Sequence, residues 1–294
     1  MILMPSKLSV CSPFCLSCII LFETVRSDAL AKLAISTELA MAVAKEAARA
    51  SGEILLKYFR EDAYRTKYKE DTSLQTTADL ESEQAIIDTI KSNFPQHSID
   101  SEERGYFRTS SPFKWIIDAL DGTENFVLGI PYFSSSITLC EENMPIIAVV
   151  YNPVTKDLFT AERGYGAFLN GTRIGVSNKV QLKGSRTFFI PDFDTKCFPK
   201  TACVRNKLYG NCRRVLDTWS PALDWCLVAS GKVDSVVSIS HRPIQPDAGI
   251  LILEEAGGKI TDFENRAFND DNSGRIVGSN ALLHDQLLQL INEE

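Results

Sequence analysis

One short stretch constrains this chain most: WIIDALDGTENF, residues 115–126, where an apolar run ends in two aspartates and then Gly-Thr. Such a run predicts a buried strand that ends near Asp118. Asp-Gly is a common turn dipeptide, so a plain loop is one interpretation. The other is a site in which Asp118 and Asp121 hold a metal ion while Gly122 and Thr123 receive a phosphate group, because a helix start offers free N–H groups.

The metal interpretation needs hard oxygen ligands beside an anion-binding turn, and this stretch contains both. In open α/β sheets, ligands collect at the carboxyl ends of strands, where Asp118 is expected. Carboxylates beside a phosphate require a cation between them, and Mg²⁺ is usually shared by carboxylates, water and phosphate. Haloacid-dehalogenase-type phosphatases instead use Asp-x-Asp-Gly-Thr, with both aspartates on one strand face. Here the two aspartates are three residues apart instead of two, which disfavours that family.

Composition limits the ligands that this chain can bind. Its 294 residues, 44% of them hydrophobic, are enough for a large core in one domain or two. Its 31 basic and 38 acidic residues give a net charge of −7 without a Lys/Arg block, so nucleic acid is not expected as the main ligand. Eight cysteines, three of them within the first 18 residues and the rest apart, are too sparse for a disulfide scaffold and predict free thiols inside the cell. We expect a cytoplasmic protein that is not attached to a membrane.

Hydrophobic periodicity predicts a layered α/β protein. Helical patterns cover residues 37–59, 77–94, 220–232, 246–258 and 280–294. Strand patterns cover residues 97–103, 113–118, 144–153, 157–171, 185–192, 233–239 and 259–263. Residues 60–76 are polar and of mixed charge, which predicts a mobile loop or a short hairpin. We expect an α+β lobe at 37–180 that carries the metal site, and an α/β lobe at 181–294.

Residues 1–36 differ from the rest and are expected to form a poorly ordered extension. Their apolar stretch, CSPFCLSCIILF, is broken by Ser and Pro and is too short to span a bilayer. As a secretory signal it is weak, because its basic start is thin and no small-residue cleavage site follows. An over-long start ahead of a true beginning near Met41 is the other interpretation.

Two further acidic features accompany the aspartates. Glu102 and Glu103 end a strand pattern in DSEERG, and Asp247 opens a late helix in PDAGILILEEAGG. Each alone has an ordinary explanation, since loop glutamates usually face water and an aspartate before a helix usually caps it. Their order and spacing relative to Asp118 and Asp121 make coincidence hard to defend, which favours one shared metal site.

Together these motifs resemble the inositol monophosphatase family of lithium-sensitive, Mg²⁺-dependent phosphatases, over residues 40–290. WIIDALDGTENF is similar to the family's Trp-(hydrophobic)₂-Asp-Pro-(hydrophobic)-Asp-Gly-Thr-x-Asn-Phe signature, with Ala119 replacing Pro. SEE stands where the family has Gly-Glu-Glu, and PDAGILILEEAGG stands for Trp-Asp-x-Ala-Ala-Gly followed by Glu-Ala-Gly-Gly. Residues 149–174 and ALDWCLVASGKVD also follow the family. The resemblance implies a sandwich of alternating helix and sheet layers, and a homodimer.

The resemblance also implies which residues hold the metal. Two or three Mg²⁺ ions would be bound by carboxylates and one backbone carbonyl, which belong to Glu102, Asp118, Asp121, Asp247 and Leu120. Thr123 would pair with Glu102 to orient and deprotonate a water that the metal activates, and Asp121 would complete the catalytic group.

Further roles implied by the resemblance concern the phosphate and a third metal. The amides of Gly122 and Thr123 would hold the phosphoryl oxygens. Asp79 matches an acidic position that the family uses for a weaker third metal site. Lys67 or Lys69, in the preceding polar segment, would help to organise that site.

Departures from the family concern the substrate. Members that act on inositol phosphates carry a Glu shortly before the last metal-binding Asp, whereas no acid lies between Asp234 and Asp247 here. A site that recognises hydroxyls discriminates through such groups, so this loss weakens the inositol assignment and leaves the phosphatase chemistry intact. Residues that could meet the substrate are Trp219, Ser220, Ser238, Ser240, His241 and Arg242.

The expected function is hydrolysis of a small phosphomonoester similar to inositol monophosphate. Histidinol phosphate, fructose 1,6-bisphosphate and a 3′-phosphonucleotide are alternatives, although residues 124–126, Glu-Asn-Phe, differ from the Lys-Glu-Phe of nucleotidases. A regulatory binding protein that keeps the fold is the alternative from another class. Loss of a key residue would favour it, yet the chain retains Glu102, Asp118, Asp121, Thr123 and Asp247.

Overall fold

The computed structural model describes residues 36–61, 64–69, 73–191, 198–240, 248–268 and 274–293. His241, Arg242 and Asp247 therefore lie outside the described residues, as does nearly all of the expected extension at 1–36. The chain divides into two units, Met1–Leu39 and Ala40–Glu294, and the fold and the site below belong to the second.

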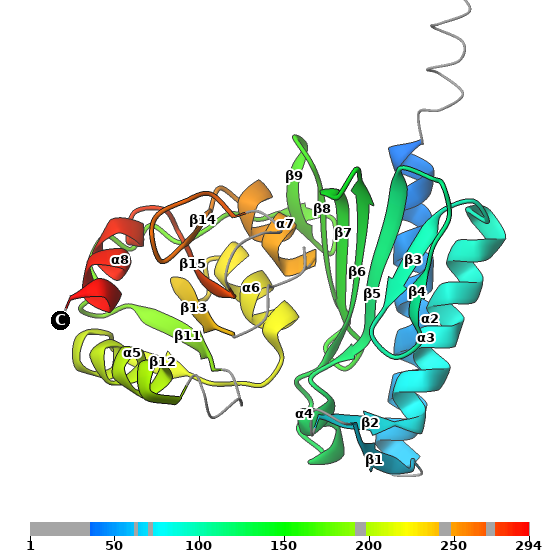
Figure 1. Ribbon diagram of the computed structural model, residues 1–294, viewed down its shortest axis with the longest axis horizontal. Helices are drawn as coiled ribbons and strands as arrows, with labels where there is room; N and C mark the ends of the chain where they lie inside the picture. Colours follow the sequence, from blue (N-terminus) through cyan, green and yellow to red (C-terminus); the bar gives the residue numbers. More distant parts are fainter. Residues whose placement is uncertain are drawn as a thin grey trace, which may run out of the picture. The chain divides into compact units, whose positions relative to one another are not determined.

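The described chain contains both helices and strands, with several runs of consecutive strands (Figure 1). The helices are α2 (Thr37–Glu61), α3 (Thr77–Asn93), α4 (Thr123–Val127), α5 (Phe198–Asn211), α6 (Pro221–Ala229), α7 (Ala248–Glu255) and α8 (His284–Asn292). Within the described ranges, no helix is long and apolar enough to cross a membrane.

The strands form two large sheets and a short hairpin. The hairpin consists of β1 (Thr66–Tyr68) and β2 (Leu74–Thr76). The first sheet contains β3 (Ser98–Ser101), β4 (Gly105–Phe107), β5 (Phe113–Asp121), β6 (Ser134–Glu141), β7 (Met144–Asn152), β8 (Asp157–Glu162), β9 (Gly166–Leu169) and β10 (Thr172–Arg173). The second contains β11 (Arg186–Ile190), β12 (Arg214–Leu216), β13 (Ser235–Ile239), β14 (Lys259–Asp262) and β15 (Arg275–Ser279).

The eight-stranded sheet has the order β10-β9-β8-β7-β6-β5-β3-β4 and is antiparallel except where β3 runs parallel to β5. Helices α2 and α3 cover one face of it, as Figure 1 shows. The packing of α2 is close, because a Cβ built on Gly52 would lie 2.6 Å from the Tyr151 ring. Ser51, its neighbour on α2, hydrogen-bonds to Ser135 of β6 at 2.7 Å.

The five-stranded sheet has the order β12-β11-β13-β15-β14, with β11 parallel to both of its neighbours. Helices α6 and α7 lie between the two sheets, and α5 and α8 cover the far face (Figure 1). One buried cluster includes Val150 and Phe159 of the first sheet, Val236 of the second, and Trp225 of α6. The predicted fold class, with alternating layers of helix and sheet, is confirmed.

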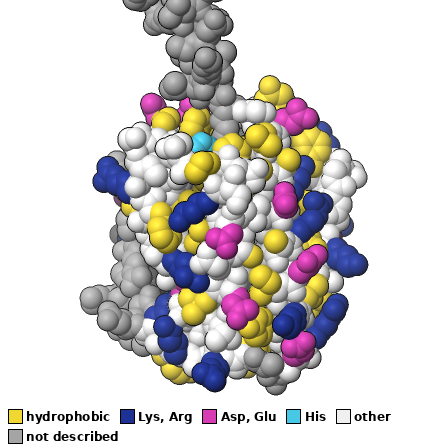
Figure 2. All heavy atoms as spheres, turned by 90° about the vertical axis from the view of Figure 1, so that its right-hand side faces the viewer, with side chains coloured by type: hydrophobic (Ala, Val, Ile, Leu, Met, Phe, Trp, Pro, Cys, Tyr) yellow, Lys and Arg dark blue, Asp and Glu magenta, His cyan; other side chains and the backbone are white. Residues whose placement is uncertain are grey.

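Charge is mixed on the face of the molecule that α2 and α3 cover. Figure 2 shows basic and acidic side chains interspersed there, with hydrophobic side chains scattered between them. Among the described side chains of this face, no block of one charge sign stands out. A mixed surface of this kind does not generate the extended positive field that nucleic-acid backbones attract.

Candidate functional site

Parallel pairing of two strands brings the first two acidic residues together. The register joins Ser101 of β3 to Ile117 of β5, so Glu102 and Asp118 follow at the same edge of the sheet. The Glu102 N–H also donates to the Ile117 carbonyl at 3.3 Å. The sequence placed Asp118 at the end of a strand in an open α/β sheet. The site instead lies on a largely antiparallel sheet, and only this one parallel pair supplies the shared edge.

Strand β5 continues through Asp121, three residues beyond the predicted end, with an irregular register between Asp118 and Asp121. Within this irregular segment, the Leu120 N–H donates to the Asp118 carboxylate at 3.0 Å. The chain then turns at Gly122, where φ is +95°, and α4 begins at Thr123. A left-handed residue is required here, because this turn redirects the strand into the helix.

Asp118 lies in a concentration of negative charge. Burial raises its pKa well above the ordinary value, and the charges of Glu102, Asp121 and Asp79 raise it further. Burial also raises the pKa of Asp79 to about 6, against the opposing effect of hydrogen bonds from Thr76 and Thr123. Carboxylates that repel one another in a partly buried site are stabilised by a cation.

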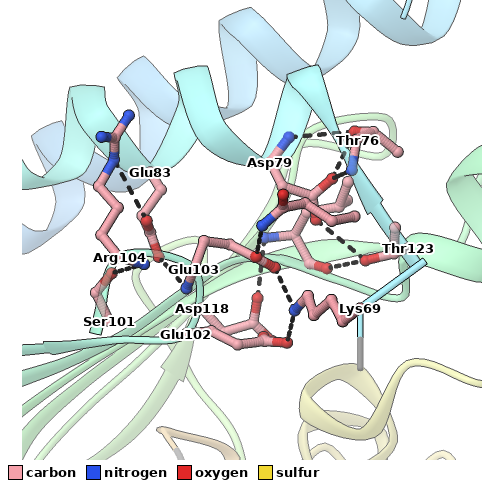
Figure 3. Close-up of polar contacts among 12 residues, drawn as sticks. Lys69, Thr76, Asp79, Glu83, Ser101, Glu102, Glu103, Arg104, Asp118 and Thr123 are labelled. Carbon is pink, nitrogen blue, oxygen red and sulfur yellow. Dashed lines mark hydrogen bonds and ion pairs between the residues drawn. The ribbon is translucent and has the colours of Figure 1, made fainter. Parts of the chain in front are cut away.

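Thr123 makes its described contacts to Asp79 and Leu120, and its predicted action with Glu102 on a water stays a prediction. Its hydroxyl lies 3.2 Å from Asp79 Oδ1 and 3.1 Å from the Leu120 carbonyl, whereas Glu102 is paired with Lys69 (Figure 3). Asp79 is the third residue of α3 and forms a capping box with Thr76. The cap fixes the Asp79 carboxylate in place, which explains why it faces Thr123.

Asp121 is held by a segment from the other end of the chain. Its Oδ2 accepts hydrogen bonds from the Ser220 hydroxyl at 2.5 Å and from the Ala222 N–H at 3.1 Å, at the start of α6. Ser134 of β6 donates to the same oxygen at 3.3 Å. Of the predicted substrate residues, Ser220 is thus the one that the described contacts bring to a candidate metal ligand.

Trp219, which precedes Ser220, has a left-handed backbone with φ at +57° and is 44% exposed. A bulky residue rarely adopts this conformation, at a cost of about 1–2 kcal/mol. Its neighbour Thr218 is held on both sides: the hydroxyl donates to Asp224 at 2.5 Å, and the carbonyl accepts from Asn125 at 2.7 Å. The strained position is therefore maintained by the hydrogen bonds around it.

Asp224 and Tyr132 were not singled out from the sequence. Asp224 is buried on α6, and its Oδ1 accepts hydrogen bonds from the Tyr132 and Thr218 hydroxyls. Burial raises the pKa of Asp224 to about 7, although both hydroxyls oppose this shift. The sequence could have indicated Asp224, because it is an acidic residue within the apolar helix pattern PALDWCLVA. The pattern does not predict which residues would hydrogen-bond to it.

Lys69 is the lysine that reaches the acidic cluster. Its Nζ lies 2.8 Å from Glu102 Oε1 and 2.5 Å from Glu103 Oε1, and Figure 3 shows it pointing toward both carboxylates. Lys67, the other candidate, is exposed on β1, where its backbone pairs with Gln75. Burial would lower the pKa of Lys69, but the charges of Glu102 and Glu103 and their hydrogen bonds raise it above its ordinary value.

The remaining predicted residues are not brought to this cluster by any described contact. Ser238 is buried within β13, and Ser240 follows that strand, with its N–H donating to the Gly274 carbonyl at 2.6 Å. In the part of the chain that the structure describes, no three His, Cys, Asp or Glu side chains converge as a ready metal-binding group. Glu102 is paired with Lys69, and Asp121 is held by α6.

The sequence model of the inositol monophosphatase family matches residues 37–294. The chain belongs to this family. It is 37% identical over 252 residues to a protein of Pasteurella multocida called Nus factor SuhB, a match that covers 85% of this chain and 94% of that protein.

Solved structures agree with this assignment. The extragenic suppressor protein SuhB from Bartonella henselae is 28% identical with a TM-score of 0.82, covering 87% of this chain and 99% of that one. An inositol monophosphatase from Anabaena is 31% identical with a TM-score of 0.77, covering 87% and 96%. The family resemblance seen in the motifs is therefore confirmed, and with it the layered fold.

Proposed function

We propose that this protein is a Mg²⁺-dependent phosphomonoesterase that hydrolyses a small phosphorylated metabolite. The observation that carries the proposal is the position of Glu102 beside Asp118, with Asp79 and Asp121 close enough for their charges to raise the Asp118 pKa. Membership of a family whose relatives include inositol monophosphatases supports it. A cytoplasmic homodimer that is sensitive to lithium completes the proposal, and these traits rest on the family resemblance alone.

The residues at this site fit a hard divalent cation. The donors are carboxylate oxygens and the Leu120 carbonyl, the ligand types that Mg²⁺ prefers. Lys69 also supplies a positive charge to this cluster through its ion pair with Glu102. Glu102, Asp118, Asp121 and the Leu120 carbonyl would bind Mg²⁺ together with Asp247. When bound, the ion activates water and neutralises phosphoryl oxygens.

Thr123 and Asp79 can move the proton of the attacking water. Thr123 Oγ1 lies 3.2 Å from Asp79 Oδ1, so the hydroxyl can take a proton from water as it gives its own to that oxygen. A carboxylate with a pKa of about 6 is well matched to this role near neutral pH. The backbone amides of Gly122 and Thr123 would receive the phosphoryl oxygens, and Ser220 keeps Asp121 in place.

The organic part of the substrate would meet the segment around Trp219. This residue is exposed, its backbone is held rigidly, and it is adjacent to Ser220, which contacts Asp121. Polyol recognition needs hydrogen-bonding groups, whereas an exposed indole suits a flat ring or an apolar surface. Inositol monophosphate, histidinol phosphate, fructose 1,6-bisphosphate and a 3′-phosphonucleotide are the substrates to compare.

A regulatory binding role is the second candidate. The relatives that share 37% identity are called Nus factor, and this name favours a role as a binding partner. Such a role does not need intact catalytic chemistry. Retention of Glu102, Asp118, Asp121 and Thr123 favours the enzyme, because a binding surface alone would not maintain a cluster of mutually repelling carboxylates.

The test is phosphate release from the four candidate substrates, with Mg²⁺ and with EDTA. We expect Mg²⁺-dependent turnover with a preference for one compound. Asp121→Asn should reduce turnover by roughly 100-fold or more, since loss of even supporting groups at a metal site costs 10–100-fold. Asp285→Asn is the matched control, because Asp285 is 87% exposed on α8 and should leave turnover unchanged. Folded protein that binds Mg²⁺ yet releases no phosphate would favour the regulatory role.

A further inference from the structure

Four side chains form a chain of contacts that leads from the β1–β2 hairpin to the candidate metal site. We name Gln75, Glu103, Lys69 and Glu102 the Lys69 network. Gln75 Nε2 donates to Glu103 Oε2, and Lys69 joins Glu103 Oε1 to Glu102 Oε1. Figure 3 shows the last three of these residues, with the lysine between the two carboxylates.

The two glutamates differ in their access to solvent. The Glu102 side chain is 49% exposed, whereas the Glu103 side chain is 6% exposed. Glu103 is also fixed through its backbone, because its N–H donates to Glu83 Oε1 at 3.0 Å. An ion from solvent can therefore reach the Glu102 carboxylate directly. The buried Glu103 carboxylate contacts Lys69 and Gln75 instead.

Two buried side-chain oxygens in and beside this network have no hydrogen-bond partner. Among the described buried side chains, the oxygens without a hydrogen-bond partner are Gln75 Oε1 and Glu83 Oε2, and both side chains contact Glu103. Glu83 Oε2 also forms an ion pair with Arg104 Nε at 3.6 Å, which is longer than a hydrogen bond. A buried oxygen without a hydrogen-bond partner is costly, so each one requires an explanation. Both of them here lie against the residue that holds Lys69.

We propose that Lys69 neutralises Glu102 until Mg²⁺ takes its place, and that Glu103, fixed by Gln75, is the positioning residue that retains the displaced lysine. This inference rests on the proposed metal site. Lys69 and Mg²⁺ compete for one half-exposed carboxylate, because both are cations and Glu102 Oε1 is already within 2.8 Å of the ammonium. Glu103 gives Lys69 a second, buried partner, so Mg²⁺ can displace the lysine from Glu102 without leaving the ammonium unpaired.

Mg²⁺ binding, measured by isothermal titration calorimetry on the full chain without substrate, tests this competition. Lys69→Met removes the competitor and should tighten Mg²⁺ binding roughly fivefold or more, the scale of coupling between contacting groups. Lys67→Met is the matched control: it removes the same charge from the same hairpin, from an exposed side chain that does not enter the network. We expect its effect to stay within about twofold.

Glu103→Gln tests the positioning role. With Glu103 neutral, Lys69 pairs with Glu102 alone, so Mg²⁺ binding should weaken roughly fivefold or more. In the Lys69→Met background the same change should alter affinity by at most about twofold, because no lysine is left to retain. Equal weakening in both backgrounds would mean that Glu103 acts only through its own charge or through the fold, and would overturn its role.

The outcomes also separate this inference from the proposed function. If the wild-type chain binds Mg²⁺ and Lys69→Met behaves like Lys67→Met, the competition is wrong while the metal site stands. If neither the wild-type chain nor Lys69→Met binds Mg²⁺, the metal site and the inference are both wrong. Should Glu103→Gln fail to fold, the comparison of the two lysine variants still decides the competition.

Discussion

At the scale of single residues, burial explains most of the unusual ionisation in this protein. Asp79 and Asp224 have their pKa raised by burial to about 6 and about 7, and each is compensated by hydroxyl donors. His284 shows the opposite shift for the same reason, because burial disfavours its charged form and lowers its pKa to about 4. Each of these groups makes stability depend on pH.

His284 should destabilise the fold as pH falls. It is fully buried between the Thr261 hydroxyl at 2.8 Å and the Ser279 hydroxyl at 3.0 Å. Its native pKa is below its unfolded value near 6.5, so the unfolded state gains the proton first. The free energy of unfolding is therefore unaffected by His284 above about pH 6.5. Between that pH and about pH 4, protonation of the unfolded state lowers the free energy of unfolding progressively.

The change in the free energy of unfolding from pH 7 to pH 5, measured by urea denaturation, isolates this effect. His284 should account for a loss of about 2 kcal/mol at pH 5. In His284→Gln, which keeps polar groups near both hydroxyls, that part of the loss should disappear. An identical pH dependence in the wild type and the variant would contradict the assignment.

At the scale of elements, the site depends on how β5 ends. The strand carries Asp118 and Asp121 through an irregular register, and Gly122 turns the chain into α4. Phe126 of α4 packs against Phe59 and Phe133, and the three ring centroids are 4.9–5.5 Å apart. The side chains of the site are thus fixed by packing beneath the turn as well as by the strand itself.

Gly122→Ala should damage both stability and activity. A Cβ at this position would meet Ser220 Cβ and the Tyr132 carbonyl at 3.1 Å, in a backbone with φ at +95°. Left-handed strain and close packing together predict a loss of roughly 2–4 kcal/mol. Because Ser220 also holds Asp121, the same contact should lower Mg²⁺-dependent turnover.

Gly129→Ala is the control for this substitution, and thermal unfolding of the two variants is the measurement. Gly129 also has a positive φ, +72°, but a Cβ there would meet nothing within 4 Å. It should show only the left-handed cost of about 1–2 kcal/mol, with turnover preserved. If both variants lose the same stability and Gly122→Ala keeps its activity, the close approach of Ser220 is unimportant.

At the scale of the whole molecule, the helices between the sheets join them into one core. The strands of the first sheet all precede residue 180 and those of the second all follow it, while the predicted boundary between lobes near that residue stays a prediction. Yet Val150, Val236 and Trp225 belong to one buried cluster. A Cβ on Gly278 of β15 would lie 2.3 Å from the Trp225 ring, so the second sheet packs directly against α6.

We therefore expect the two lobes to unfold together. Denaturation followed by tryptophan fluorescence and by far-UV circular dichroism should give coincident transitions, because exposure of Trp225 removes packing from both sheets at once. Two separate transitions would instead indicate lobes that are stable independently, and the boundary near residue 180 would then mark true folding domains.

The sequence by itself determined the elements whose signals are local. Helices α2, α3, α6 and α8 and strands β5, β7 and β13 follow from periodicity, since one buried face imposes its spacing on the residues. Strand β6, SSSITLCE, was missed because its buried positions include serines, and α5, FPKTACVRNKLYGN, because Pro, Gly and polar residues obscure its pattern. The acidic motifs were recognisable because their order along the chain is itself distinctive.

Only the tertiary structure decided the partners of those acidic residues. It placed the Thr123 hydroxyl against Asp79, brought Lys69 and not Lys67 to Glu102, and brought Ser220 to Asp121 across 99 positions of sequence. A hydrogen bond between distant segments depends on which elements pack together and in what register. The spacing of residues along the chain does not determine that arrangement. The sequence therefore predicts which residue types form this site, but it does not predict the contacts between them.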